Sequence, residues 1–277
     1  MRIGSIAAFF VILFSFAPLS AGAAPSGAQP GVWADGALAT AVNSPVRDPK
    51  NAARDRFRHP RESLSFWGLR PGMSILEIWP GGGYWTDILA PYAKATHGTY
   101  TAALQATSRP LPARFADKAL YGDIRTTVFN ETSGPLVAPG SADFVLLSRN
   151  LHDWMGEPGI PEKAMRDFYA ALKPGGILAV EQHRADPRPM KPDASDGYMS
   201  TAVVVQLAQK AGFKLEDQSE INANPKDTKD HPFGVWTLPP TRQSAPRGQP
   251  PNPNFDHSKY DAIGESDRMT LRFRKPM

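Results

Sequence analysis

Residues 76–83 read Leu-Glu-Ile-Trp-Pro-Gly-Gly-Gly, an apolar run that carries one acidic residue and ends on three glycines. The apolar residues from Ser74 to Trp79 predict a β-strand, and the residues from Tyr84 to Leu89 can begin a helix. A strand that turns on glycines into a helix lets the backbone approach a ligand closely, because glycine has no side chain in the way. The stretch therefore predicts a site for a nucleotide-like ligand where this strand ends.

Strand-like and helix-like segments alternate along the chain. The predicted strands cover residues 74–79, 98–104, 125–130, 143–148, 177–182, 213–219 and 269–273. The predicted helices cover one or two segments in 49–69, interrupted at Pro60, and then 84–89, 113–120, 162–172 and 199–211. Pro91 is expected to end the helix that follows the glycines. This alternation predicts an α/β fold with a doubly wound, seven-stranded and mostly parallel sheet.

The ends of the chain and its proline content suggest a division into parts. Residues 1–23 have one charge, Arg2, and an apolar run at 6–17 that is shorter than the roughly 20 residues needed to span a bilayer. We expect a cleaved signal peptide rather than an anchor, and a periplasmic or secreted protein without stable membrane insertion. Residues 24–48 are expected to be a flexible lead-in and residues 49–277 one domain. In that domain residues 221–265 hold eight prolines, which predicts an irregular insertion that can cover the site.

The composition excludes several classes of function. The chain contains no cysteine, so it has no disulfide, no thiolate nucleophile and no cysteine-bound metal. Its formal net charge is only +4, and the short basic clusters at 54–61 and 272–275 lack the interleaved aromatic residues of a nucleic-acid surface. We therefore expect a small-molecule ligand and no nucleic acid.

The glycine turn does not fit the two commonest phosphate-binding patterns. Thr86 stands where the dinucleotide pattern Gly-x-Gly-x-x-Gly needs its last glycine, and the Gly-Lys-Ser/Thr of a P-loop is absent. Residues 76–83 instead resemble the first motif of class I S-adenosylmethionine-dependent methyltransferases. Residues 142–147, 172–176 and 211–213 resemble the fourth strand, the turn before the fifth strand and the entry to the sixth strand of that family. Residues 149–154 and 224–231 are similar to a branch of exported, predicted methyltransferases.

This resemblance implies a Rossmann-like methyltransferase fold and assigns residues to the cofactor. The glycines would let the backbone pass the methionine end of S-adenosylmethionine, Glu77 would orient the loop, and Asn130 would meet the adenine. Asn150 follows the fourth strand, where the family brings substrate and cofactor together. The cofactor-binding residues implied are Glu77, Gly81, Gly82, Gly83 and Asn130.

Two histidines are candidates for the base that removes a proton from the methyl acceptor. His152 follows the fourth strand and His183 follows the fifth. In this fold both strands end beside the glycine turn, at the edge of the sheet where ligands bind. Histidine titrates near neutral pH, so His152 is the first candidate, His183 the second, and Asn150 completes the predicted catalytic group. Arg184 is open to two interpretations, a contact to an acidic substrate or an ion pair with Glu181 or Asp186.

The leading hypothesis is therefore methyl transfer from S-adenosylmethionine to an unidentified small acceptor. Trp79 replaces the usual first glycine, and residues 102–105 end the second strand without the acid that normally binds the ribose. These two features favour an alternative, an exported binding or sensing protein that kept the fold and no longer uses the cofactor. A metal site at His152, Asp153, His183 and His231 is a weaker alternative, since no ligand spacing supports it. Serine hydrolysis has no Gly-x-Ser-x-Gly elbow.

Overall fold

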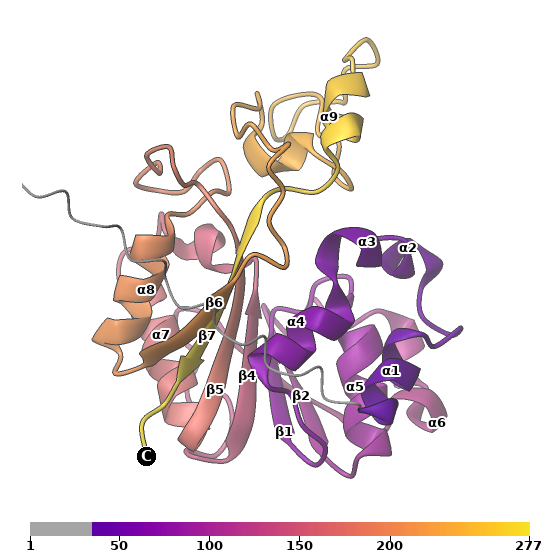
Figure 1. Ribbon diagram of the computed structural model, residues 1–277, viewed down its shortest axis with the longest axis vertical. Coiled ribbons are helices and arrows are strands. Elements are labelled where there is room, and N and C mark those ends of the chain that lie inside the picture. The colour runs from indigo at the N-terminus through magenta and orange to yellow at the C-terminus, as the bar shows by residue number, and fades with distance from the viewer. Residues whose placement is uncertain (1–34) are drawn as a thin grey trace, which may run out of the picture. The chain divides into compact units, whose positions relative to one another are not determined.

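The computed structural model describes residues 35–277, which form one α/β unit around a seven-stranded sheet (Figure 1). The predicted signal peptide, residues 1–23, and residues 24–34 of the predicted lead-in lie outside the described residues. The strands are β1 Ser74–Ile78, β2 Thr99–Leu104, β3 Ile124–Val128, β4 Ala142–Ser148, β5 Leu172–His183, β6 Lys214–Ser219 and β7 Arg268–Arg274. Their order is β3-β2-β1-β4-β5-β7-β6, with β7 antiparallel to both neighbours. The prediction of a doubly wound, mostly parallel sheet is confirmed.

Helices cover both faces of the sheet. The helices are α1 Gly36–Val42, α2 Pro49–Ala52, α3 Asp55–Arg58, α4 Pro60–Trp67, α5 Thr86–Ala95, α6 Lys118–Tyr121, α7 Ile160–Ala171, α8 Thr201–Lys210 and α9 Ser258–Ile263. One apolar cluster joins α1, α4 and α5 to the sheet, and a second joins α7 and α8 to the opposite face. These two layers bury the sheet from both sides, which is why the central strands β4 and β5 each contain a continuous apolar run, at 144–147 and 177–180. No helix of residues 35–277 has the length and apolar character needed to cross a membrane.

Three local predictions differ from the structure. The helix α5 passes through Pro91 and ends at Ala95. A proline inside a helix costs about 3 kcal/mol, and the burial of Leu89 and Tyr92 on either side of it offsets this cost. The turn expected at 173–176 forms part of β5, where the pairing with β4 shifts in register. Finally, residues 36–42 of the expected lead-in form α1, which begins at the N-cap Asp35.

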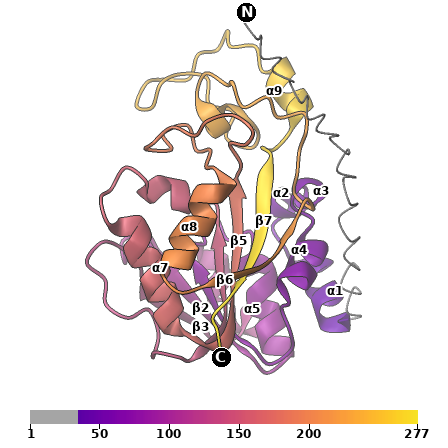
Figure 2. The ribbon, with the colours of Figure 1, turned by 60° about the vertical axis from the view of Figure 1, so that its left-hand side comes forward.

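The long segment between β6 and β7 lies at the edge of the sheet where β5 ends (Figures 1 and 2). It contains the short helix η3, Gly234–Thr237, and α9, and its other residues lie in turns and irregular backbone. The helices α2 and α3 approach the same edge, because Arg54 and Arg58 both form ion pairs with Glu265 at the end of this segment. The edge that carries the glycine turn is therefore enclosed from two sides.

Candidate functional site

A cavity of about 250 Å³ lies where β1, β4 and β5 end. Its walls come from the glycine turn, the residues after β4 and β5, the α2–α3 segment, and the segment between β6 and β7. Predicted site residues that line it are Glu77, Gly81, Gly82, Asn150, His152 and His183. A second, wider hollow of about 650 Å³ shares His152, Asp153 and Trp236 with it. The predicted convergence of three strand ends on one site is what the sheet order produces.

The three glycines of the turn are not equivalent. A Cβ atom added to Gly81 or Gly82 would meet no atom within 4 Å, so both positions face open space. A Cβ on Gly83 would lie 2.3 Å from the ring of Phe115. Gly83 therefore makes room for a side chain of the protein, and a ligand can approach the backbone only at Gly81 and Gly82.

Glu77 is enclosed beneath the turn, with 2% of its surface exposed. Its carboxyl group accepts hydrogen bonds from Tyr100 at 2.5 Å and from Thr86, the first residue of α5, at 3.1 Å. Burial raises the pKa of Glu77 to about 7, although both hydrogen bonds and the nearby Arg149 favour the charged form. The contacts link the end of β1 to the start of α5 and so fix the conformation between them.

Two amides predicted to contact ligands have different surroundings. Asn150 lines the cavity, and its Nδ2 donates a hydrogen bond of 2.7 Å to the carbonyl of Ile78. It therefore ties the end of β4 to the end of β1. The side chain of Asn130 accepts hydrogen bonds from the backbone and hydroxyl of Thr132 and closes its own loop. Asn130 is not among the residues that line the cavity.

Trp79 extends from the end of β1 over the end of β3. Its backbone has a φ of +46°, a conformation that bulky residues rarely adopt. The indole Nε1 donates a hydrogen bond of 2.8 Å to the carbonyl of Phe129, and the ring packs edge-on against Trp154 at 5.0 Å. Among the described residues, none between Trp85 and Ser148 lines the cavity. The open space therefore lies toward β4 and β5, away from the ends of β2 and β3.

The two histidines lie together, with ring centres 5.4 Å apart, and differ in their free nitrogens. Nδ1 of His152 accepts a hydrogen bond of 2.9 Å from the amide of Gln182, and its Nε2 lies 3.4 Å from the Asp153 carboxylate. Nδ1 of His183 is hydrogen-bonded to the hydroxyl of Ser266 at 2.5 Å. Within residues 35–277, Nε2 of His183 has no partner, and this residue lines the cavity.

Burial lowers the pKa of both histidines, and that of His183 falls well below its ordinary value. The neighbouring His152 and the arginines Arg149 and Arg268 lower the pKa of His183 further, because they disfavour a second positive charge. His183 is thus a neutral imidazole at pH 7, and its Nε2 can accept a proton if Nδ1 donates its hydrogen to Ser266.

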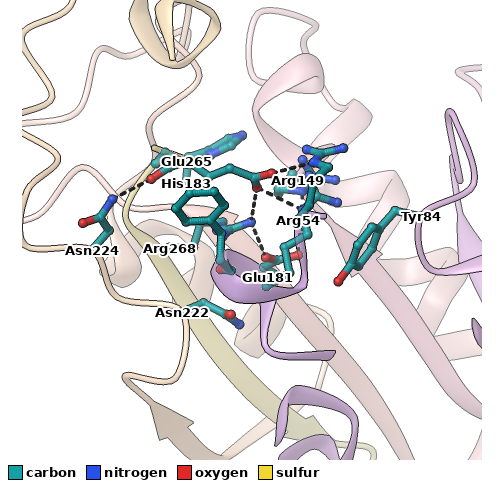
Figure 3. A network of polar contacts seen from close by, with 12 residues as sticks. Arg54, Tyr84, Arg149, Glu181, His183, Asn222, Asn224, Glu265 and Arg268 are labelled. Carbon is teal, nitrogen blue, oxygen red and sulfur yellow. Dashed lines mark hydrogen bonds and ion pairs between the residues drawn. The ribbon is translucent and has the colours of Figure 1, made fainter. Parts of the chain in front are cut away.

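Four arginines and two glutamates form a charge cluster at the wall of the cavity (Figure 3). Its members are Arg54, Arg58, Arg149, Glu181, Glu265 and Arg268. The sequence does not predict this cluster, because its members come from separate segments and share no spacing. Glu181 was a possible partner of Arg184, Arg54 and Arg58 lie in the basic stretch 54–61, and Arg149 lies in the motif at 149–154.

Residues of the motif at 224–231 hold the long segment in place. Asp227 is buried and accepts hydrogen bonds from Tyr198 at 2.9 Å and from His231 at 2.8 Å. Arg184 pairs with Glu220 and Asp267, in place of Glu181 or Asp186. The residues of the segment that line the cavity lie further on and include Trp236 and Pro239. No group of three or more potential metal ligands occurs in residues 35–277.

Comparisons with known proteins give the fold a context. No family model and no curated protein matches the chain. Among solved structures, a SAM-dependent methyltransferase from Aquifex aeolicus is 20% identical, with a TM-score of 0.52 over 63% of this chain and 88% of its own. A putative sarcosine dimethylglycine methyltransferase from Galdieria sulphuraria is 12% identical, with a TM-score of 0.52 over 81% and 87%. The (4+2)-cyclase SpnF is 15% identical, with a TM-score of 0.52 over 82% of each chain. The chain therefore has the Rossmann-like fold of S-adenosylmethionine-dependent methyltransferases.

Proposed function

We propose that this protein transfers a methyl group from S-adenosylmethionine to a small acceptor in the cavity at the ends of β1, β4 and β5. One observation carries the proposal: the open glycines Gly81 and Gly82 face the same cavity as the free Nε2 of His183. A close backbone approach for the cofactor and a proton acceptor for the substrate thus share one enclosed space. S-adenosylmethionine, when bound, supplies an electrophilic methyl group.

Residues of the chain accept the proton and position the acceptor and the glycine turn. His183 accepts the proton that an acceptor oxygen loses as it is methylated, and its lowered pKa permits this because an oxygen that gains a methyl group becomes a strong acid. His152 is less suited to this step than the sequence suggested, because its Nδ1 already accepts a hydrogen bond from Gln182. We assign His152 to the wall that positions the acceptor. Asn150 holds the end of β1 and thereby the glycine turn at a fixed distance from His183.

A second candidate function has a specific observation in its favour. Trp79 covers the end of β3, where the resemblance puts the adenine, and β2 ends at Leu104 without an acid for the ribose. The loss of one charge-assisted hydrogen bond weakens binding roughly ten- to a hundredfold. These features favour a protein that binds or converts a small ligand without S-adenosylmethionine. SpnF is a (4+2)-cyclase with a similar structure, which illustrates that this fold alone does not fix the function.

Calorimetric titration with S-adenosylmethionine and S-adenosylhomocysteine separates the two candidates. For the methyltransferase we expect saturable heat with both ligands. Gly82→Val should abolish binding, because its side chain would fill the space beside the turn without striking the protein. Gly134→Val is the matched control, since Gly134 also faces open space but does not line the cavity.

Two results would contradict the proposal. If neither ligand produced heat at millimolar concentration, methyl transfer would be rejected and the second candidate function would remain. Unchanged affinity in Gly82→Val would show that the ligand binds away from the glycine turn. Gly83→Val is unsuitable for this test, because it would displace Phe115 whether or not a ligand binds there.

A further inference from the structure

The charge cluster has more positive than negative groups. Glu265 pairs with Arg54, Arg58 and Arg268 at 2.5, 3.0 and 3.0 Å. Glu181 pairs with Arg268 at 2.9 Å and lies 3.7 Å from Arg149. Four guanidinium groups and two carboxylates leave a formal charge of +2 in the cluster. Glu77 and Asp153 line other parts of the cavity, so the excess of positive groups is confined to the side that the cluster forms. Such a local excess favours the binding of an anion there.

Two of the arginines line the cavity and have nitrogens without a partner. The side chains of Arg54 and Arg149 are 20% and 24% exposed, and both residues line the cavity. Nε of Arg54 donates to Glu265 at 2.5 Å, and Nε of Arg149 donates to the hydroxyl of Ser148 at 3.4 Å and lies 3.7 Å from Glu181. In residues 35–277 their four Nη atoms have no hydrogen-bond partner, and they are not sealed from solvent. They are therefore available to a ligand.

The other two arginines have different surroundings. Arg58 is fully buried beneath the cluster, with its guanidinium 4.3 Å from the centre of the Tyr84 ring. Arg268 is 1% exposed and reaches both glutamates. Arg58 pairs with Glu265, and Arg268 pairs with Glu181 and Glu265. Glu265 also lines the cavity, but three arginines balance its charge, so the guanidinium nitrogens left without a partner belong to Arg54 and Arg149.

The backbone supports a role for Arg149 in ligand binding. Its φ is +61°, in the left-handed region that residues with side chains seldom adopt. Trp79, at the end of the neighbouring strand β1, also has a positive φ and lines the same cavity. Backbone strain of this kind persists where the surrounding structure holds a residue in place, commonly at ligand sites.

We propose that the acceptor is a small carboxylic acid whose carboxylate binds between Arg54 and Arg149. The planar edge of a guanidinium group matches the two oxygens of a carboxylate, which is why arginine is preferred for such contacts. Glu77, Asp153 and Glu265 also line the cavity, and they repel the two charges that a phosphate dianion carries on one group more strongly than the single charge of one carboxylate group. The inference rests on the proposed function, because it names the class of molecule that is methylated.

Binding of glutarate, a small dicarboxylate, tests the inference without any cofactor. We expect isothermal titration to show saturable binding of glutarate and none of its neutral diamide, glutaramide. Arg54→Gln and Arg149→Lys should weaken glutarate binding roughly ten- to a hundredfold, the loss expected for a charge-assisted contact. Arg56→Gln is the matched control, because Arg56 is an exposed residue in the same helix as Arg58 and does not line the cavity. Far-ultraviolet circular dichroism and the thermal midpoint establish that each variant is folded.

Titrations of glutarate in the presence of saturating S-adenosylhomocysteine distinguish a site for the acceptor from a site for the carboxylate of the cofactor. Unchanged glutarate affinity in its presence supports a separate acceptor site. Competition between the two ligands would overturn the inference, because the arginines would then hold the methionine end of the cofactor. Equal or tighter binding of inorganic phosphate would also overturn it, as would no binding of glutarate to the folded wild-type protein. Glutarate binding together with no binding of S-adenosylhomocysteine would reject methyl transfer and retain the carboxylate site.

Discussion

Replacing Trp79 with glycine or alanine tests whether its backbone is strained. Either change removes the indole hydrogen bond to Phe129 and the ring contacts with Trp154 and Phe129. A hydrogen bond contributes about 1 kcal/mol and each ring pair about 1 kcal/mol. Loss of all three predicts a destabilisation of about 3 kcal/mol for the alanine variant. Glycine should be more stable than alanine here by about 0.5–1 kcal/mol, because relief of the φ of +46° outweighs the greater flexibility of the unfolded chain.

Urea unfolding followed by circular dichroism at 222 nm measures this difference, provided that the dependence of stability on urea is the same for both variants. Val46 offers a control, since it is 49% exposed and its φ is not positive. At Val46 the order should reverse, with alanine more stable than glycine. If glycine were the less stable residue at position 79 as well, the strain argument would fail, and with it the view that the end of β1 is held in an unfavourable conformation.

Two further predictions concern Glu77 and Gly234. The pKa of Glu77, about 7 against an ordinary 4.5, means that the native state binds its proton more tightly than the unfolded state. The stability that this proton contributes is complete below pH 4.5 and is lost as the pH rises through 7, a loss of about 3 kcal/mol for 2.5 pKa units. In urea unfolding, the stability of Glu77→Gln relative to wild type should therefore increase by about 3 kcal/mol between pH 4.5 and pH 8. A difference in stability that does not change with pH would contradict the raised pKa. Gly234→Ala should cost at least about 2 kcal/mol, because its Cβ would lie 2.2 Å from the carbonyl of Asp196 at a φ of +57°. The control Gly248→Ala, with a φ of +86° and open space around it, should cost only about 1 kcal/mol in the same assay, and equal costs would reject the close approach.

The sheet could be predicted from the sequence because its central strands are buried on both faces. The predicted strands at 143–148 and 177–182 contain the continuous apolar runs 144–147 and 177–180, and both lie within the strands observed, β4 and β5. Local pattern was less informative where tertiary contacts dominate. Pro91 indicated a helix end by its own chemistry, and only the packing of α5 against the sheet shows why the helix continues.

The sequence allowed us to predict where the candidate residues lie in the fold, but only in part which of their atoms are free to react. The position of His152 and His183 after neighbouring strands follows from the order of strands in this fold. Which of their nitrogens is free depends on Gln182 and Ser266, which no spacing rule connects with them. The arginines of the charge cluster lie at 54, 58, 149 and 268, so only the folded chain brings them together.

The position of β7 has a consequence for the synthesis of the protein. This strand lies between β5 and β6, and β6 pairs with no other strand in residues 35–277. The ribosome must therefore complete residues 268–274 before β6 can join the sheet. Arg268 is the first residue of β7 and pairs with both Glu181 and Glu265. A nascent chain that stops before this residue lacks the strand that closes the sheet and the cation that joins the two glutamates, so truncated translation products cannot form the charge cluster.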